Sequence, residues 1–142
     1  MTFRLLEVML TLGLMLCAGS GCNIQKDVER NSEEDKNRLG AIECPINATI
    51  VDNVDKNRGD MTDWKFFFIP SPTVVEIIIA FDNANAKAIA VIRESTGVQK
   101  NLIEHRGEPL IKSSFKAKPG VYYIQVYARQ ESTDYTLEIM TQ

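Results

Sequence analysis

Short apolar segments that alternate with polar residues every second position dominate the chain from Ala41 onward. Clusters of turn-forming residues, such as DNANA at 82–86 and STG at 95–97, separate these segments. Successive side chains of a strand point to opposite faces of a sheet, so this period is typical of half-buried strands. The pattern predicts an all-β fold, an antiparallel β-sandwich of about eight strands with jelly-roll or Greek-key connections.

The predicted strands share β-branched and aromatic content and end at glycine, proline or asparagine clusters. They cover residues 48–52, 64–69, 74–81, 87–94, 99–105, 110–116, 121–129 and 134–141. Residues 53–63 are predicted to form a polar loop, and no helix is expected. The predicted core takes one face of the apolar strands: Trp64, Phe66, Phe68, Val75, Ile77, Ile79, Phe81, Tyr122, Ile124, Val126, Tyr135, Leu137 and Ile139.

An uncharged apolar run at residues 8–18 follows Arg4 near the start of the chain. A membrane-spanning helix needs about 20 apolar residues, so this shorter run is typical of a secretory signal peptide. It ends in LCAGSGC at 16–22, which resembles the bacterial lipobox, with Gly19 where leucine is usual. The resemblance implies that Cys22 becomes the acylated first residue of the mature protein. Ordinary secretion with a fortuitous cysteine is the alternative.

Three regions follow from this interpretation: a signal peptide at 1–21, a lipidated cysteine with a charged tether at 22–38, and one domain at 39–142. The tether is rich in charge and poor in aliphatic residues, so it buries too little apolar surface to fold alone. A lipid on Cys22 would place the protein in the bacterial cell envelope. Asn23 after the cysteine resembles the outer-membrane address of enteric bacteria.

The cysteine count and the charge exclude several kinds of site. Once Cys17 leaves with the signal peptide and Cys22 is acylated, Cys44 has no cysteine to pair with. One histidine and no Cys-x-x-Cys motif argue against a zinc site, and Cys44 is expected to be a small buried side chain and not a reactive thiol. The net charge of −3 is spread along the chain, whereas a nucleic-acid binder usually shows a basic cluster.

Three segments resemble the bacterial pre-peptidase C-terminal domain: DWKFFFIPSPTVVEIIIAF at 63–81, GVYYIQVYAR at 120–129 and DYTLEIM at 134–140. The resemblance covers about residues 33–142. It implies a β-sandwich of the kind that is appended to secreted proteases and is not itself catalytic. His105 shows no catalytic partner by pattern, and the motifs of the usual hydrolases are missing, so no enzyme activity is predicted.

Oxygen-rich side chains before two of the strands predict a calcium site. Glu33, Asp35 and Asn37 alternate, so in an extended segment they would point the same way, and Asp60 and Asp63 bracket a turn. Calcium takes six to eight oxygen ligands. In collagen-binding members of the resembled family, a Glu-x-Glu-Pro-Asn run and an Asp-x-x-Asp turn bind calcium, and EEDKN and DMTD fall on those positions, with Lys36 in place of proline. The alternative is a solvated tether and loop that never meet.

A binding surface is predicted on the strand at 121–129. If Tyr122, Ile124 and Val126 point inward, then Tyr123, Gln125, Tyr127 and Arg129 point outward, and tyrosine and arginine are favoured at interfaces. The alternative is that these are ordinary surface residues of a half-exposed strand with no role in binding. Two functions remain open: an anchored binding module for a protein or polysaccharide, and a structural subunit of an envelope assembly such as a secretion or motility complex.

Overall fold

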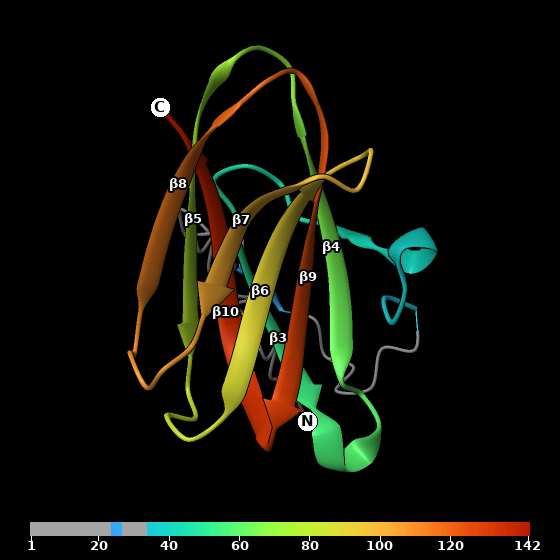
Figure 1. Ribbon diagram of the computed structural model, residues 1–142, viewed down its shortest axis with the longest axis vertical. Coiled ribbons are helices and arrows are strands. Elements are labelled where there is room, and N and C mark those ends of the chain that lie inside the picture. The colour runs from blue at the N-terminus through green and yellow to red at the C-terminus, as the bar shows by residue number, and fades with distance from the viewer. Residues whose placement is uncertain (1–23, 27–33) are drawn as a thin grey trace, which may run out of the picture.

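The computed structural model describes residues 24–26 and 34–142. Two five-stranded sheets pack face to face as a sandwich (Figure 1). The signal peptide, Cys22 and Glu33 lie outside the described residues. Among those that are described, no helix has the length and apolar character needed to cross a membrane.

Sheet A has the strand order β1-β3-β10-β5-β8, and sheet B has the order β2-β4-β9-β6-β7. The strands are β1 (Ile24–Lys26), β2 (Ile42–Glu43), β3 (Thr49–Asp55), β4 (Thr62–Ile69), β5 (Thr73–Phe81), β6 (Lys87–Glu94), β7 (Gln99–Glu104), β8 (Ile111–Ala117), β9 (Gly120–Gln130) and β10 (Ser132–Thr141). Two short 3-10 helices, η1 (Arg38–Gly40) and η2 (Lys56–Arg58), accompany them.

All eight predicted strands are present, and the antiparallel β-sandwich is confirmed. Two short strands were not predicted. β1 pairs in parallel with β3, and β2 pairs in parallel with β4. The predicted loop at 53–63 is shorter than expected, because β3 continues to Asp55 and β4 begins at Thr62.

The core lies between the sheets and follows the predicted faces of three long strands. Val75, Ile77, Ile79 and Phe81 of β5 are buried, as are the inward residues of β9 and β10: Tyr122, Ile124, Val126, Tyr135, Leu137 and Ile139. Dense β-branched side chains suit these strands because they pack well on a pleated surface. The central strands β10 and β9 thus form the middle of the two layers.

The predicted face of β4 is wrong. Trp64 and Phe66 are half-buried on the outer surface of sheet B, and Phe68 is 55% exposed. The inward residues are Asp63, Lys65, Phe67 and Ile69. Because the side-chain period of a strand is two, placing it one residue out of step moves every side chain to the opposite face.

Candidate functional site

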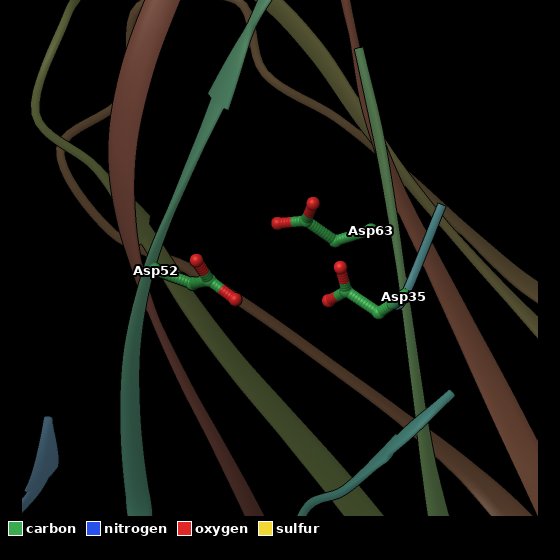
Figure 2. A group of neighbouring side chains, drawn as sticks. All are labelled: Asp35, Asp52 and Asp63. Carbon is green, nitrogen blue, oxygen red and sulfur yellow. The ribbon is translucent and has the colours of Figure 1, made fainter. Parts of the chain in front are cut away.

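A buried polar cluster joins the two sheets near one edge of the sandwich, where β3 of sheet A faces β4 of sheet B. Lys65 points inward from β4 and is fully buried. Its Nζ donates hydrogen bonds to Asp35 Oδ2 at 2.6 Å and to Asp52 Oδ2 of β3. Figure 2 shows the carboxylates of Asp35, Asp52 and Asp63 turned toward a common centre. The ammonium therefore links sheet A, sheet B and the segment that precedes η1.

Asp63 and Tyr135 complete this cluster. Tyr135 stands opposite Asp52 in the β3–β10 ladder, and its hydroxyl donates to Asp63 Oδ2 at 2.7 Å. Asp63 is fully buried, and its Oδ1 has no hydrogen-bond partner. A buried acceptor without a partner costs about 1–3 kcal/mol. This oxygen is therefore free to accept a hydrogen bond or to bind a cation.

The charges in the cluster shift one another's pKa values. Burial alone would lower the pKa of Lys65, but the attraction of Asp52 and the hydrogen bonds to Asp35 and Asp52 outweigh it and hold that pKa above its ordinary value. Burial, followed by repulsion from Asp52 and Asp35, raises the pKa of Asp63 to about 8. Burial also holds the pKa of Tyr135 well above its ordinary value, so its phenol stays a donor.

The segment 34–40 is shaped so that Asp35 can reach Lys65. The Asp35 carbonyl accepts a hydrogen bond from Trp64 N at 2.8 Å, which fixes the segment along the edge of β4. Asn37 Oδ1 accepts from the backbone of Leu39 at 3.0 Å and caps η1. Gly40 packs so closely on the Glu34 carbonyl that any Cβ there would overlap it. Contact with the sandwich thus begins within the stretch that the sequence predicts as a tether.

Of the five residues predicted to bind calcium, Glu33 lies outside the described residues, and the other four are only partly brought together. Asp35 and Asp63 do lie together, but Asn37 is occupied as a helix cap because 34–40 turns instead of running straight. The main chain of Asp60 pairs with Asp55, and burial, with repulsion from Asp35 and Asp52, raises the pKa of its carboxyl to about 6.

Sequence reasoning missed Asp52 and Lys65. With the Lys65 ammonium between Asp35 and Asp52, this arrangement does not fit calcium. The calcium binding that the sequence predicts is not tested by this geometry.

An aromatic face covers the outside of sheet B; it consists of Trp64, Phe66 and Phe68 of β4 with Tyr123 and Tyr127 of β9. The Phe66 and Tyr123 rings lie 6.3 Å apart, and Trp64 meets Tyr123 edge-on at 6.5 Å. The guanidinium of Arg38 lies 4.2 Å from the centre of the Tyr123 ring, within the range of a cation–π contact.

The strand register extends this surface across four strands. Trp64 lies beside Gln125, Gln125 beside Val91 of β6, and Val91 beside Leu102 of β7. A second row contains Thr62, Tyr127, Ile89 and Glu104. Ile89 and Val91 are buried although they do not belong to the core between the sheets. The outer surface of sheet B is thus a second apolar layer with exposed edges.

The predicted outward strip on β9 has the orientation that the sequence indicates. Tyr123, Gln125 and Tyr127 are half-buried, and Arg129 is exposed. The guanidinium of Arg129 lies 5.8 Å from the centre of the Tyr127 ring. What the sequence reasoning missed is that Trp64, Phe66 and Phe68 continue this surface. The signal was present, since the alternative face of β4 places all three aromatic residues outside.

A surface hollow of about 480 Å³ adjoins the aromatic face at the ends of β6, β7 and β9. Lys87, Arg106 and Arg129 line it, together with Glu104, which pairs with Arg106 at 2.9 Å. His105 also lines it and is buried, with Nδ1 2.8 Å from the Ala86 carbonyl and Nε2 without a partner. The hollow therefore carries an excess of positive charge.

Cys44 lies in the core, fully buried and free, as the sequence predicts. Burial raises the pKa of its thiol to about 12. Because the thiolate is the reactive form, this thiol is inert in the folded protein.

No protein-family model and no curated protein matches this chain. Among solved structures, the pre-peptidase C-terminal domain of a collagenase from Bacillus anthracis matches with a TM-score of 0.58 and 23% identity, covering 70% of this chain and 93% of that domain. The Yersinia pseudotuberculosis-derived mitogen matches with a TM-score of 0.48 and 10% identity, over 67% of this chain and 85% of that one. The resemblance to the pre-peptidase C-terminal domain is confirmed at the level of the fold.

Proposed function

We propose that this protein is a lipid-anchored, non-catalytic binding module that holds a partner protein on the aromatic face of sheet B. The observation that carries the proposal is the outward orientation of Trp64, Phe66 and Phe68 beside Tyr123 and Tyr127. Five aromatic side chains on one solvent-facing surface expose apolar area that a monomer would otherwise bury. Tyrosine and tryptophan are also enriched where binding energy concentrates.

The composition of this surface favours a protein over a polysaccharide. Phe68 is 55% exposed and Leu102 is 44% exposed, and Ile89 and Val91 of β6 adjoin β9 on the same face. Apolar and aromatic side chains of this kind are typical of the centre of protein interfaces.

The basic hollow at the end of the same sheet adds a polar edge to the surface. Arg129 contacts Tyr127 of the aromatic face and also lines the hollow, with Lys87 and Arg106 beside it. Charges around an interface steer association and set its register more than they add affinity. We therefore expect the partner to bring an acidic group to this end.

The geometry of the polar cluster supports a non-catalytic role. Asp35, Asp63 and Lys65 combine the groups that an acid–base site would use, but all three are fully buried. A substrate cannot reach them in this arrangement, since general acid–base catalysis needs a group within hydrogen-bond distance of the reacting atoms. Their role is to join the sheets.

Attachment to the membrane is proposed through Cys22, which lies outside the described residues. Two or more acyl chains give stable anchoring, at about 0.8 kcal/mol for each buried methylene. The Cys22→Ala variant should lose fatty-acid labelling and move to the soluble fraction. Labelling that persists in this variant would refute the anchor and leave the binding face untouched.

The binding face is tested by photo-crosslinking of the membrane-bound protein in the cells that make it. A photoreactive amino acid replaces Phe68, and the matched control replaces Leu110, which is 50% exposed but lies outside the aromatic face. We expect one discrete, protease-sensitive adduct from position 68 and none from position 110. Tyr123→Ala should reduce that adduct by about tenfold, equal to about 1.4 kcal/mol of binding.

Two outcomes would contradict the proposal. Equal adducts from both positions would mean that the face is not specific, and a heterogeneous adduct that resists protease would identify a polysaccharide. The identity of the captured protein also separates the two functions that the sequence left open. A fixed set of envelope proteins in constant ratio indicates an assembly subunit, whereas an external protein indicates adhesion.

A further inference from the structure

Lys65 occupies the centre of an oxygen-lined site, although lysine is among the residues that are costly to bury. It is fully buried, and it lies within hydrogen-bond distance of Asp35 and Asp52. Removing a lysine from water costs several kcal/mol unless the ammonium is paired and hydrogen-bonded. The aspartates therefore hold the ammonium in place, and the ammonium holds them together.

The three carboxylates around this ammonium have the spacing of ligands to a divalent cation. One carboxylate oxygen each from Asp35, Asp52 and Asp63 lies within 4.8 Å of the other two. Calcium binds oxygen at about 2.3–2.6 Å, so two ligands across one ion are at most about 5 Å apart. The distance of 2.6 Å between Lys65 Nζ and Asp35 Oδ2 is at the upper end of the range for a calcium–oxygen bond.

A second observation points to the same conclusion. The buried Asp63 Oδ1 has no partner, while Asp63 Oδ2 is bound by Tyr135. One ammonium offers three donors, and two of them serve Asp35 and Asp52. When Asp63 is ionised, the cluster therefore has more acceptor capacity than Lys65 satisfies, whereas a divalent cation takes six or more oxygens.

We propose that Lys65 is the resident cation of this cluster, and that its ammonium pins the segment 34–40 to the sandwich without any metal ion. Asp35, Asp52 and Asp63 form a latent divalent-cation site that calcium enters only when the ammonium is removed. Asp35 reaches the cluster from the N-terminal segment, Asp52 from sheet A and Asp63 from sheet B. One internal charge thus fastens three parts of the chain.

The test compares the unaltered protein with Lys65→Met, a substitution that keeps the length of the side chain and removes its charge. Thermal unfolding of each is measured in chelator and then in millimolar calcium. The unaltered protein should melt at the same temperature in both. In chelator, Lys65→Met should melt about 10 °C lower or more, because its aspartates lose their counter-ion. Calcium should restore at least half of that loss and bind with one ion per chain by calorimetry.

Asp52→Asn/Lys65→Met is the matched control, since it removes one of the three carboxylates together with the ammonium. It should show no calcium response. A calcium-induced rise of several degrees in the unaltered protein would overturn the proposal, because the ion would then bind with Lys65 in place. A folded Lys65→Met variant that ignores calcium would overturn it too. If Lys65→Met is unfolded in chelator, failure to refold on adding calcium counts against the latent site.

Discussion

Strands β4 and β5 follow one another in the chain and lie in opposite sheets, yet they place different kinds of side chain in the core. β5 presents Val75, Ile77, Ile79 and Phe81 inward, as a simple reading of its alternation predicts. β4 presents Asp63 and Lys65 inward along with Phe67 and Ile69, and it presents its other aromatic residues to the outside. The difference shows that alternation identifies a strand but does not by itself say which face is buried.

The environment of each strand explains the difference. β5 lies between β10 and β8, and its inward residues meet other apolar side chains, so packing alone decides its face. β4 lies near the edge of sheet B, opposite Asp52 of β3 and beside the segment that carries Asp35. A charged residue can be buried there because charges of opposite sign come from two other parts of the chain.

The largest effect is expected from moving the charge of β4 into β5. Ile77→Lys places an ammonium where the neighbours are apolar, and nothing comparable to Asp35 and Asp52 is opposite. An unpaired buried charge costs several kcal/mol, which is comparable with the whole stability of an ordinary domain, about 5–15 kcal/mol. Circular dichroism should show loss of the cooperative thermal transition, whereas the unaltered protein tolerates Lys65 in the facing sheet. A cooperative transition in this variant would mean that the core of β5 adapts to charge.

An intermediate effect is expected from Asp52→Asn, which removes one partner of the buried ammonium. Breaking a buried pair in this way costs about 3–5 kcal/mol, so the melting temperature should fall by roughly 10 °C or more. The matched control is Glu104→Gln, which removes the partner of Arg106 in an exposed pair and should change the melting temperature by less than about 2 °C, since exposed pairs contribute little. Equal changes in melting temperature in the two variants would show that the buried pair stabilises the fold no more than the exposed pair does.

The smallest effect concerns the pH dependence of Asp63. Its pKa of about 8 in the folded protein lies above the ordinary value of 3.8, so the folded state holds a proton that the unfolded state releases. The stability that this proton provides is complete below about pH 4 and is lost as the pH rises toward 8. The Asp63→Asn side chain is neutral at every pH and does not lose this contribution, so the melting temperature of the variant should exceed that of the unaltered protein by several degrees at pH 7.

The same pair of proteins should converge near pH 4, where both side chains are neutral. Comparing the two removes the contributions of Asp52 and Asp60, whose pKa values are also raised by burial. A difference that stays constant between pH 4 and pH 8 would show that Asp63 is not protonated in the folded protein.

The fold was predictable from the sequence because each long strand carries its own signal. The eight predicted strands needed only local information, namely the β-branched runs of β5 and β6 and the turns between them. The turn at 95–97 illustrates this, since Gly97 adopts a φ of 91° that other residues rarely reach. β1 and β2 escaped notice because they contain three and two residues, too few for any period to appear.

The polar cluster was only partly predictable, because its members come from three separate segments. Asp35 and Asp63 are predicted as oxygen ligands, and Asp35 has that role toward Lys65, whereas Asp63 accepts its hydrogen bond from Tyr135. Asp52 was read as the polar end of a strand, and Lys65 as an outward residue of β4. Both were missed for one reason: a buried ion pair between distant residues leaves no local pattern, and an assumed apolar core excludes it.

The aromatic face and the Lys65 cluster both depend on the orientation of β4, and two neighbouring phenylalanines test it most directly. Phe67 is buried and stacks on Tyr122 at 5.4 Å, whereas Phe68 is 55% exposed on the aromatic face. The melting temperatures of Phe67→Ala and Phe68→Ala are compared with that of the unaltered protein. Phe67→Ala should cost about 3–5 kcal/mol and lower the melting temperature by more than 10 °C. Phe68→Ala should change it by no more than about 3 °C, because little buried area is lost. If Phe68→Ala lowers the melting temperature more than Phe67→Ala does, then Asp63 and Lys65 point outward. Neither the aromatic face nor the Lys65 cluster would then exist.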